Sequence, residues 1–323
     1  MSTRIGIVAP NWLGDAVMAL PAIADVRRGS PGARISVVAR PPITTLFTLV
    51  RDVDDVLEKG ATRVGDQDVA ILLPNSFRSA YDVRRAGIRE RWGYRTDGRR
   101  WLLTRAIARA GEATHQVDSY QQLVEALGFP NGERVPRLTL PPESRRAGAE
   151  ALSAAGWDGV KPIVALAPGA AYGGAKRWPP EYFAELARGF ADDGIVSVIV
   201  GSSADAPTAA EIVGAAGHRR SAILDLVGRT DVATLAGALA HARVIVSNDS
   251  GAVHLAAAVG VPVTAVFGPT SERLAAPRSA AASVVLRHDV WCRPCMLREC
   301  PIDHRCMRGV SVAAAADAAR RLL

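Results

Sequence analysis

Apolar and polar residues alternate in blocks over residues 244–270, and the blocks have the lengths of strands and helices. Val244–Val246 and Val263–Phe267 are short runs rich in β-branched residues, as in strands buried on both faces. Between them, Leu255–Val259 is a small-residue helical segment ended by a glycine and a proline. The polar residues gather in Ser247–Gly251. The pattern predicts a βαβ unit whose chemistry lies beyond the carboxyl end of a parallel strand, where open α/β sheets bind ligands.

The same alternation divides the rest of the chain into two similar halves. Each half opens with a strand, at Ile5–Ala9 or Ile163–Ala167, that runs into a glycine-containing loop and a helix. Strands that alternate with helical patterns imply parallel sheets. Further strands are predicted at Ile35–Ala39, Val69–Leu73, Val196–Val200 and Ile223–Leu226, and helices at about 16–28, 143–155, 180–192 and 312–323.

The strongest break in this pattern is the turn-rich passage Pro130–Pro142, which one Ala-rich helix and Gly156 follow. We therefore expect two domains, residues 1–157 and 158–323. The predicted fold class is α/β, with two Rossmann-like, doubly wound domains that face each other across a cleft. Such a cleft is where a polar substrate pair would be enclosed.

Composition agrees with this picture. A chain of 323 residues with 49% hydrophobic and 22% charged residues is typical of a soluble globular protein. Residues 251–270 carry no Asp, Glu, Lys or Arg, but they contain His254, Gly260, Pro262 and Pro269 and therefore break up into separate elements, so no membrane span is predicted. Because the chain opens on a strand, we expect no secretory signal and a cytoplasmic location.

The net charge of +7 is concentrated in one segment. Residues 78–109 hold ten arginines against Asp82, Glu90 and Asp97. One interpretation is a solvated arginine-rich surface; the other is an electropositive face for a phosphate-bearing glycolipid. Nucleic acid is not expected as a partner, because few aromatic residues are interleaved with the arginines.

Asp15 lies between the first strand and the first helix, in the sequence Asn11-Trp-Leu-Gly-Asp15. Its position alone makes it an N-cap or first-turn residue, and a cap stabilises a helix by about 1 kcal/mol. The alternative is that the carboxylate accepts a proton from an acceptor hydroxyl as a general base. Gly14 would let another molecule approach the backbone there.

The loop Gly169–Pro179 has the composition of a phosphate-binding loop, with three glycines and Lys176 before a helix that opens with proline. A lysine at the mouth of a helix adds its charge to the backbone N–H groups, and a diphosphate would use both. The alternative is a flexible surface loop. The GxxxxGK[ST] spacing is absent, so nucleoside triphosphate hydrolysis is not indicated.

In the opening stretch, Ser250 and Gly251 are the residues expected to offer backbone N–H groups to a phosphate. Asp249 is an anion beside that site, so we expect it to face sugar hydroxyls instead. His254 falls on the same face of the helix as Ser250 and could reach the same ligand. A packed imidazole with its hydrogen bonds satisfied is the alternative for His254.

All four cysteines fall within one short segment, at Cys292, Cys295, Cys300 and Cys306. Their density is compatible with a structural zinc site, although their spacing is not that of a standard zinc ribbon. Reduced or paired thiols are the other interpretation. Either way, we expect a structural loop and no catalytic metal.

Several motifs in the same order resemble glycosyltransferase family 9, the ADP-heptose:lipopolysaccharide heptosyltransferases, over nearly the whole chain. The motifs are Pro10–Pro21, Leu73–Ser79, Ala167–Gly173, Ala175–Pro179, Ser247–His254 and Phe267–Thr270. The resemblance implies the GT-B fold, with the acceptor on the first domain and the sugar nucleotide on the second. It also implies inverting transfer of heptose to the heptose of the lipopolysaccharide inner core, with no metal or other cofactor for catalysis.

The resemblance also implies roles for individual residues. Asp15 would be the general base and Lys176 would contact the diphosphate. The remaining donor-binding positions are Asp249, Ser250, Gly251, His254, Thr230 near the adenine, Ala171 and Tyr172 through their backbone, and Asp205 as a ribose-binding carboxylate. The implied partners are ADP-heptose, the anionic lipopolysaccharide core and the cytoplasmic face of the inner membrane.

Two alternatives within the family and one outside it remain at this point. Within the family, the chain could add the first heptose of the core or transfer a different sugar. Outside it, a zinc-stapled nucleic-acid-binding protein would give the cysteine segment the main role. A Rossmann oxidoreductase would need a G-x-G-x-x-G run after a strand, and none is present.

Overall fold

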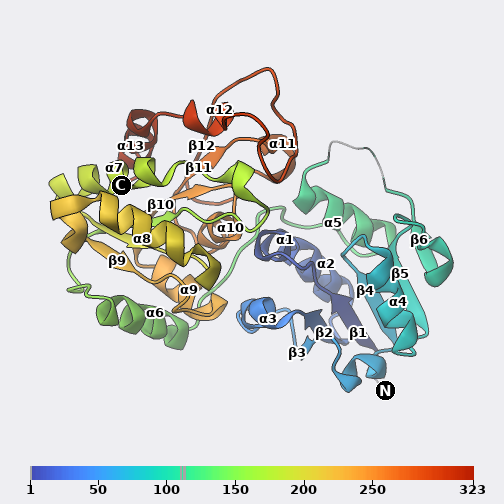
Figure 1. Cartoon of the computed structure of the whole chain (residues 1–323). Coiled ribbons are helices and arrows are strands. Elements are labelled where there is room, and N and C mark those ends of the chain that lie inside the picture. The colour runs from blue at the N-terminus through green and yellow to red at the C-terminus, as the bar shows by residue number, and fades with distance from the viewer. Residues whose placement is uncertain (1, 110, 112–113) are drawn as a thin grey trace. The chain divides into compact units, whose positions relative to one another are not determined.

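The structure is a computed structural model that describes residues 2–109, 111 and 114–323. It consists of two compact units, unit 1 at Met1–Thr139 and unit 2 at Leu140–Leu323. Each contains one six-stranded, all-parallel sheet with helices packed on it (Figure 1). None of the helices in these described ranges is long and apolar enough to cross a membrane.

In unit 1 the strand order is β3-β2-β1-β4-β5-β6, the doubly wound order with a reversal between β1 and β4. The strands are β1 (Arg4–Val8), β2 (Arg34–Ala39), β3 (Asp55–Glu58), β4 (Val69–Leu72), β5 (Glu90–Tyr94) and β6 (Arg105–Ile107). The helices are α1 (Leu13–Met18), α2 (Leu20–Gly29), α3 (Pro41–Phe47), α4 (Phe77–Arg85) and α5 (Gln116–Ala126), with short 3-10 turns η1 (Thr62–Asp66) and η2 (Arg100–Leu102).

Unit 2 repeats this order as β9-β8-β7-β10-β11-β12, so its reversal lies between β7 and β10. The strands are β7 (Ile163–Ala167), β8 (Val196–Ile199), β9 (Ile223–Asp225), β10 (Ala242–Asn248), β11 (Val263–Phe267) and β12 (Ser283–Arg287). The helices are α6 (Pro142–Ala154), α7 (Pro180–Asp192), α8 (Ala206–Ala215), α9 (Val232–Leu239), α10 (Gly251–Ala258), α11 (Glu272–Ala275), α12 (Arg305–Arg308) and α13 (Val312–Arg320), with 3-10 turns η3 (Gly174–Lys176), η4 (Ser203–Asp205) and η5 (Gly217–Ala222).

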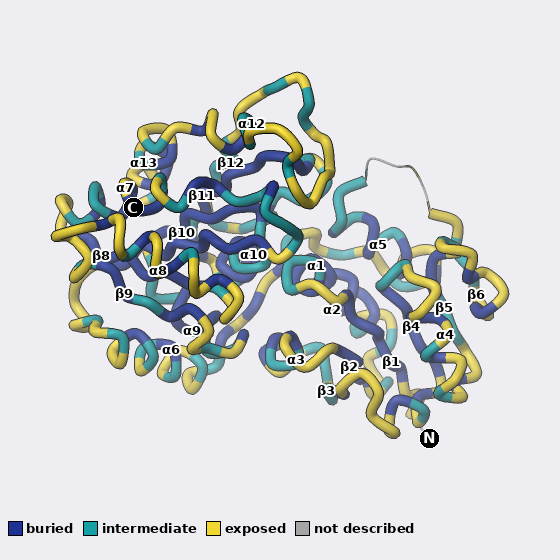
Figure 2. Tube along the Cα trace, in the orientation of Figure 1, coloured by how far each residue is buried: buried dark blue, intermediate teal, exposed yellow. Residues whose placement is uncertain are grey.

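The core of each unit lies between its sheet and the helices, and the central strands are buried (Figure 2). Helix α7 illustrates why these sequences fold as they do. It begins at Pro180, where a proline needs no N–H partner, and Phe183, Leu186 and Phe190 form one buried stripe at helical spacing. The stripe packs on alternate residues of β7 and β10, and α7 ends just before Gly194, whose φ of 75° suits glycine.

The contacts divide the chain between residues 139 and 140, one helix earlier than the expected boundary after 157. The reason is that α6 packs on α9 of unit 2. Gly148 of α6 and Gly237 of α9 bring the two backbones so close that a Cβ at either position would overlap the other helix. An Ala-rich amphipathic helix carries no sequence signal that indicates which sheet it will cover. The boundary predicted after residue 157 therefore assigned α6 to the first domain.

The predicted α/β class with two Rossmann-like domains is confirmed. The expected strands are all present within a residue or two at their ends, and α10 begins at Gly251, one turn earlier than predicted. Four strands were not predicted. These are the edge strands β3, β6 and β12 and the arginine-containing β5. β3, β5 and β6 have no apolar run longer than two residues, and β12 has a run of three between Ser283 and Arg287.

Candidate active site

Most of the residues selected from the sequence follow the strands that flank the reversal in each sheet. In unit 1, β1 leads to Asp15 and β4 leads to the loop before α4. In unit 2, β7 leads to the Lys176 loop and β10 leads to Asp249 and α10. The carboxyl ends of strands at such a reversal form the ligand-binding crevice of doubly wound folds. The topology thus favours these positions independently of the motifs.

Lys176 and Asp249 form a buried ion pair in unit 2. The Lys176 ammonium donates to Asp249 Oδ2 at 2.5 Å, and the side chains are only 13% and 5% exposed. The Thr270 hydroxyl donates to the same oxygen at 2.7 Å. The two side chains point toward each other. Contact of Asp249 with sugar hydroxyls and of Lys176 with a diphosphate stays a prediction. A lysine held in this way is an oriented cation rather than a mobile one.

Asn248 anchors both ends of the Lys176 loop. Its amide donates to the Pro168 carbonyl at 2.6 Å, and its Oδ1 accepts from the backbone N–H of Trp178 at 3.0 Å. The side chain is fully buried at the end of β10. It was not selected from the sequence, although its place in the polar corner after the apolar run Val244–Val246 was the signal available.

The segment that contains the first three cysteines holds the same loop from the other side. Arg298 accepts a hydrogen bond at its carbonyl from the N–H of Ala175 at 2.9 Å, and the Glu299 carboxylate accepts one from the N–H of Gly174 at 2.9 Å.

The backbone of Met296 makes two further contacts. Its carbonyl accepts from the Tyr172 hydroxyl at 2.7 Å. The backbone N–H of Met296 in turn donates to the carbonyl of Pro269 at 2.9 Å. Residues 296–299, which we name the clamp, therefore join the Lys176 loop to the turn that carries Thr270.

Tyr172 takes part through its ring as well as its hydroxyl. Its ring centroid lies 4.8 Å from Lys176 Nζ and 5.4 Å from Arg298 Cζ, so it receives two cation–π contacts. The expectation for Tyr172 and its neighbour Ala171 was contact with the donor through the backbone alone. Ala171 is exposed, and the tyrosine side chain helps to place the lysine.

Helix α10 begins beside this pair. Ser250 is its N-cap, but the hydroxyl of Ser250 is hydrogen-bonded to the hydroxyl of Ser247 at 3.0 Å instead of capping the helix. The first N–H groups from Gly251 onward, together with the helix dipole, are thus directed at the residues around Asp249. His254 lies one turn into the helix and is only 4% exposed. This burial fits the interpretation of His254 as a packed imidazole better than its interpretation as a residue that reaches the bound ligand freely.

Asp205 and Thr230 lie elsewhere in unit 2. The Asp205 carboxylate accepts from the Ser202 backbone and hydroxyl at 3.0 and 2.8 Å as a capping box, and it also lies 3.7 Å from Arg177. These contacts give Asp205 a structural role, and ribose binding by it stays a prediction. Thr230 is half-buried and precedes Asp231, the N-cap of α9, so its place near the adenine also stays a prediction.

Asp15 occupies the first turn of α1 in unit 1. The N-cap is Trp12, so of the two positions that the sequence allowed for Asp15, N-cap or first turn, the structure shows the first turn. Burial, and then the negative charge of Asp15, raise the pKa of the Tyr120 hydroxyl well above its ordinary value. The carboxylate is half-buried, and Trp12 beside it is 46% exposed. A carboxylate in this position can accept a proton from a bound hydroxyl group.

Not all of the arginines between residues 78 and 109 contribute to a charged surface. Arg99 is fully buried, and its guanidinium donates to the carbonyls of Tyr94 at 2.9 Å and Pro74 at 2.6 Å and to the Ser79 hydroxyl at 2.9 Å. Burial lowers the pKa of Arg99 to about 10, so it remains charged at neutral pH. This cation ties the loop after β4 to the loop after β5, a structural task that charge counting could not reveal.

The four cysteines are free thiols. Burial and the neighbouring Cys292 raise the pKa of the Cys306 thiol, which lies in the core of unit 2. Within the part of the chain that the structure describes, no group of three His, Cys, Asp or Glu side chains could hold a metal ion. The structure therefore gives no support to the zinc alternative, and the visible task of this segment is the clamp.

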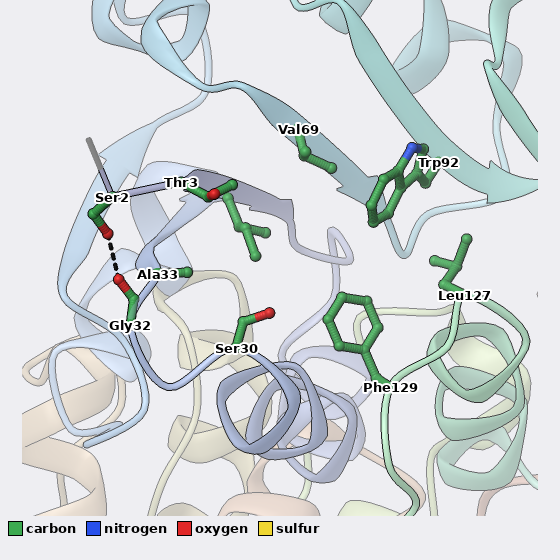
Figure 3. Close-up of a pocket in the computed structure, with 10 residues that line it drawn as sticks. Ser2, Thr3, Ser30, Gly32, Ala33, Val69, Trp92, Leu127 and Phe129 are labelled. Atoms are coloured by element: carbon green, nitrogen blue, oxygen red, sulfur yellow. Dashed lines mark hydrogen bonds between the residues drawn. The ribbon is translucent and has the colours of Figure 1, made fainter.

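Unit 1 has a hollow of about 560 Å³ near the amino ends of its central strands, whereas Asp15 follows the carboxyl end of β1. Figure 3 shows side chains that line the hollow. It is lined by residues at the amino ends of β1 and β4, by Trp92 and by the segment after α5, including Phe129. Ligands of doubly wound sheets bind at the carboxyl ends of the strands. Its lining contains no Asp, Glu, Lys or Arg, so we do not assign the reaction to it.

Comparison with known proteins agrees with the fold. The model of glycosyltransferase family 9 (heptosyltransferase) matches residues 59–305. Lipooligosaccharide heptosyltransferase 2 of Haemophilus ducreyi is 30% identical, with 87% of this chain and 88% of that protein covered. Lipopolysaccharide heptosyltransferase 1 of Pseudomonas aeruginosa is 28% identical, with 92% and 87% covered.

The solved structure of the E. coli ADP-heptose LPS heptosyltransferase II superposes with a TM-score of 0.85 at 27% identity, over 99% of this chain and 98% of that one. A family model that matches this much of the chain and a fold that agrees over its length lead to one assignment. The chain belongs to glycosyltransferase family 9, the heptosyltransferases.

Proposed function

We propose that this protein transfers L-glycero-D-manno-heptose from ADP-heptose to the heptose of the lipopolysaccharide inner core, at the cytoplasmic face of the inner membrane. The observation that carries the proposal is the Lys176–Asp249 pair beside the start of α10. A diphosphate at that helix start would meet backbone N–H groups, the positive end of the helix dipole and an ammonium already held in position. Preorganised cations of this kind stabilise the charge that develops on a leaving phosphate.

The chemistry needs only groups that this chain supplies. Asp15 would remove the proton from the attacking hydroxyl of the acceptor, while Lys176 and the first turn of α10 stabilise the departing ADP. The new bond forms on one face of the anomeric carbon as the bond to ADP breaks on the other, so a single displacement inverts that centre. We propose that the transfer proceeds without a metal ion, because the ammonium and the helix start provide the positive charge.

The choice of acceptor rests on the curated relatives. The relative with 30% identity is a heptosyltransferase 2, whereas the heptosyltransferase 1 relative is less similar. We therefore favour addition of the second heptose over addition of the first. The exposed arginines of residues 78–109 support an anionic acceptor.

A thermal-shift panel of nucleotide sugars followed by a transfer assay tests the proposal. ADP-heptose at about 100 times its Kd should stabilise the protein by roughly 2.7 kcal/mol, whereas GDP-mannose and UDP-glucose at equal concentration should not. Purified core acceptor with one heptose should then accept sugar in the presence of EDTA, and acceptor without heptose should not. Selective stabilisation by a different nucleotide sugar, or transfer only to the heptose-free acceptor, would contradict the proposal.

A further inference from the structure

Three aromatic side chains of unit 1 gather on its surface. Phe77, Tyr81 and Trp101 are 38%, 43% and 63% exposed. The rings of Phe77 and Tyr81 are stacked with centroids 6.4 Å apart, and the Trp101 ring lies 5.9 Å from Phe77. We name these three residues the aromatic patch. Large apolar side chains that cluster without becoming buried mark an interaction surface more often than scattered ones do.

The patch is additional to the core-forming face of the same elements. Helix α4 packs on the sheet through Ala80 and Val83, and η2 does so through Leu102. Phe77 and Tyr81 are four residues apart and therefore share the outer face of α4. The segment thus folds on one face and presents the aromatic rings on the other.

Positive charge surrounds the aromatic patch. Arg78, Arg84, Arg85 and Arg100 are exposed around the patch, and Arg84 Cζ lies 5.5 Å from the centre of the Trp101 ring. The one carboxylate on α4, Asp82, already accepts from Arg78 at 2.6 Å and lies 3.5 Å from Lys59. Asp97 is the other carboxylate beside the patch, and it accepts from the backbone N–H of Phe77 at 2.5 Å. The four arginines outnumber these two carboxylates, so the local balance is cationic and complementary to an anionic partner.

We propose that the aromatic patch and its arginines dock this protein on an anionic lipid bilayer. Aromatic side chains settle at the level of the headgroups, and arginines pair with lipid phosphates. A site for the sugars of the acceptor would instead be expected to enclose its ligand in a concave pocket, whereas Trp101 is mostly open to solvent. Docking on a bilayer would bring the enzyme to a membrane-anchored acceptor. Only this purpose rests on the proposed function.

Vesicle flotation with the full chain tests the docking without donor or acceptor, so its outcome does not depend on the proposed reaction. The probes are vesicles of phosphatidylcholine alone or with added phosphatidylglycerol. The wild type should float with the anionic vesicles, and added salt should weaken binding. Tyr81→Ser combined with Trp101→Ser should lower the partition coefficient roughly tenfold. Arg84→Gln combined with Arg85→Gln should lower it about fivefold for each arginine.

Trp291 of unit 2 provides the matched control, because its side chain is 78% exposed and the centre of its ring lies 5.9 Å from Arg305 Cζ. Trp291→Ser should float like the wild type. The proposal is overturned if the wild type does not bind anionic vesicles, if both double variants bind unchanged, or if Trp291→Ser loses as much binding as they do. The remaining alternative is that the aromatic patch binds the sugars of the acceptor. Heptose transfer to a water-soluble, delipidated core oligosaccharide distinguishes this alternative from membrane docking. There the Tyr81 and Trp101 double variant should keep its kcat/KM, and a matching loss would assign the patch to sugar binding instead.

Discussion

The ammonium of Lys176 lies 2.5 Å from the carboxylate of Asp249, although 73 residues separate them in the sequence. Strands β7 and β10 are neighbours in the sheet, so the loops that follow them meet at one edge. The pair is nearly enclosed, so removal of either partner would leave a charged group without a counter-ion and largely away from water.

Removing either partner of this pair should destabilise unit 2. Asp249→Asn leaves a buried ammonium without its counter-ion, and Lys176→Met leaves a buried carboxylate. We expect each change to lower the free energy of unfolding by about 3 kcal/mol, and the double variant to lose clearly less than the sum. Denaturant titration of the four proteins measures the coupling. As a control, the same cycle on the exposed pair of Arg78 and Asp82 should show less than about 1 kcal/mol.

Asp15→Asn should separate binding from chemistry. An amide cannot accept the proton of the acceptor hydroxyl, so kcat should fall by about 10²- to 10⁴-fold. The Kd for ADP-heptose, measured by calorimetry, should stay within a factor of two or so because α10 and Lys176 are unchanged. Asp66→Asn removes an exposed carboxylate from the same unit and should leave kcat at the wild-type level. An equal loss of donor affinity and turnover in Asp15→Asn would show that Asp15 is only structural.

Tyr172→Phe should reveal the contribution of the clamp to donor binding. The change removes the hydrogen bond to the Met296 carbonyl but keeps the ring beside Lys176. A lost hydrogen bond of about 0.5–1.5 kcal/mol should raise the KM for ADP-heptose by roughly two- to tenfold. Tyr182→Phe, whose ring packs on Trp178 at a centroid distance of 5.4 Å, provides a matched control that should leave this KM unchanged. Unaltered kinetics in Tyr172→Phe would mean that the clamp does not position the lysine.

Gly148→Ala should destabilise unit 2 by about 1–3 kcal/mol, because the new methyl group would force α6 away from α9. The opposite sign is expected for Gly214→Ala in α8, where an added Cβ meets no atom within 4 Å. There alanine should stabilise the helix by roughly 0.5–1 kcal/mol. Thermal melts of the two variants compare the same chemical change in a crowded and an open position. If both variants shifted the melting temperature in the same direction, the close helix packing would not be the cause.

The sequence determined much of this protein because its signals are local. Apolar runs such as Val263–Phe267 predict buried parallel strands, and proline at the start of α7 and glycine after it mark where that helix begins and ends. The family motifs lie in loops at the ends of those strands. The doubly wound fold and the positions of Asp15, Lys176 and Asp249 at the ends of strands could therefore be predicted from the sequence alone.

Tertiary structure decided what depends on segments that are distant in the chain. No local pattern states that Lys176 pairs with Asp249, that Arg298 and Glu299 hold the Lys176 loop, or that Arg99 is buried rather than exposed. The side of the boundary on which α6 belongs was also undetermined, because its apolar face would suit either unit until Gly148 met Gly237. In each case the decisive energy comes from close contact and loss of solvent, and both exist only once the sheets and helices have assembled.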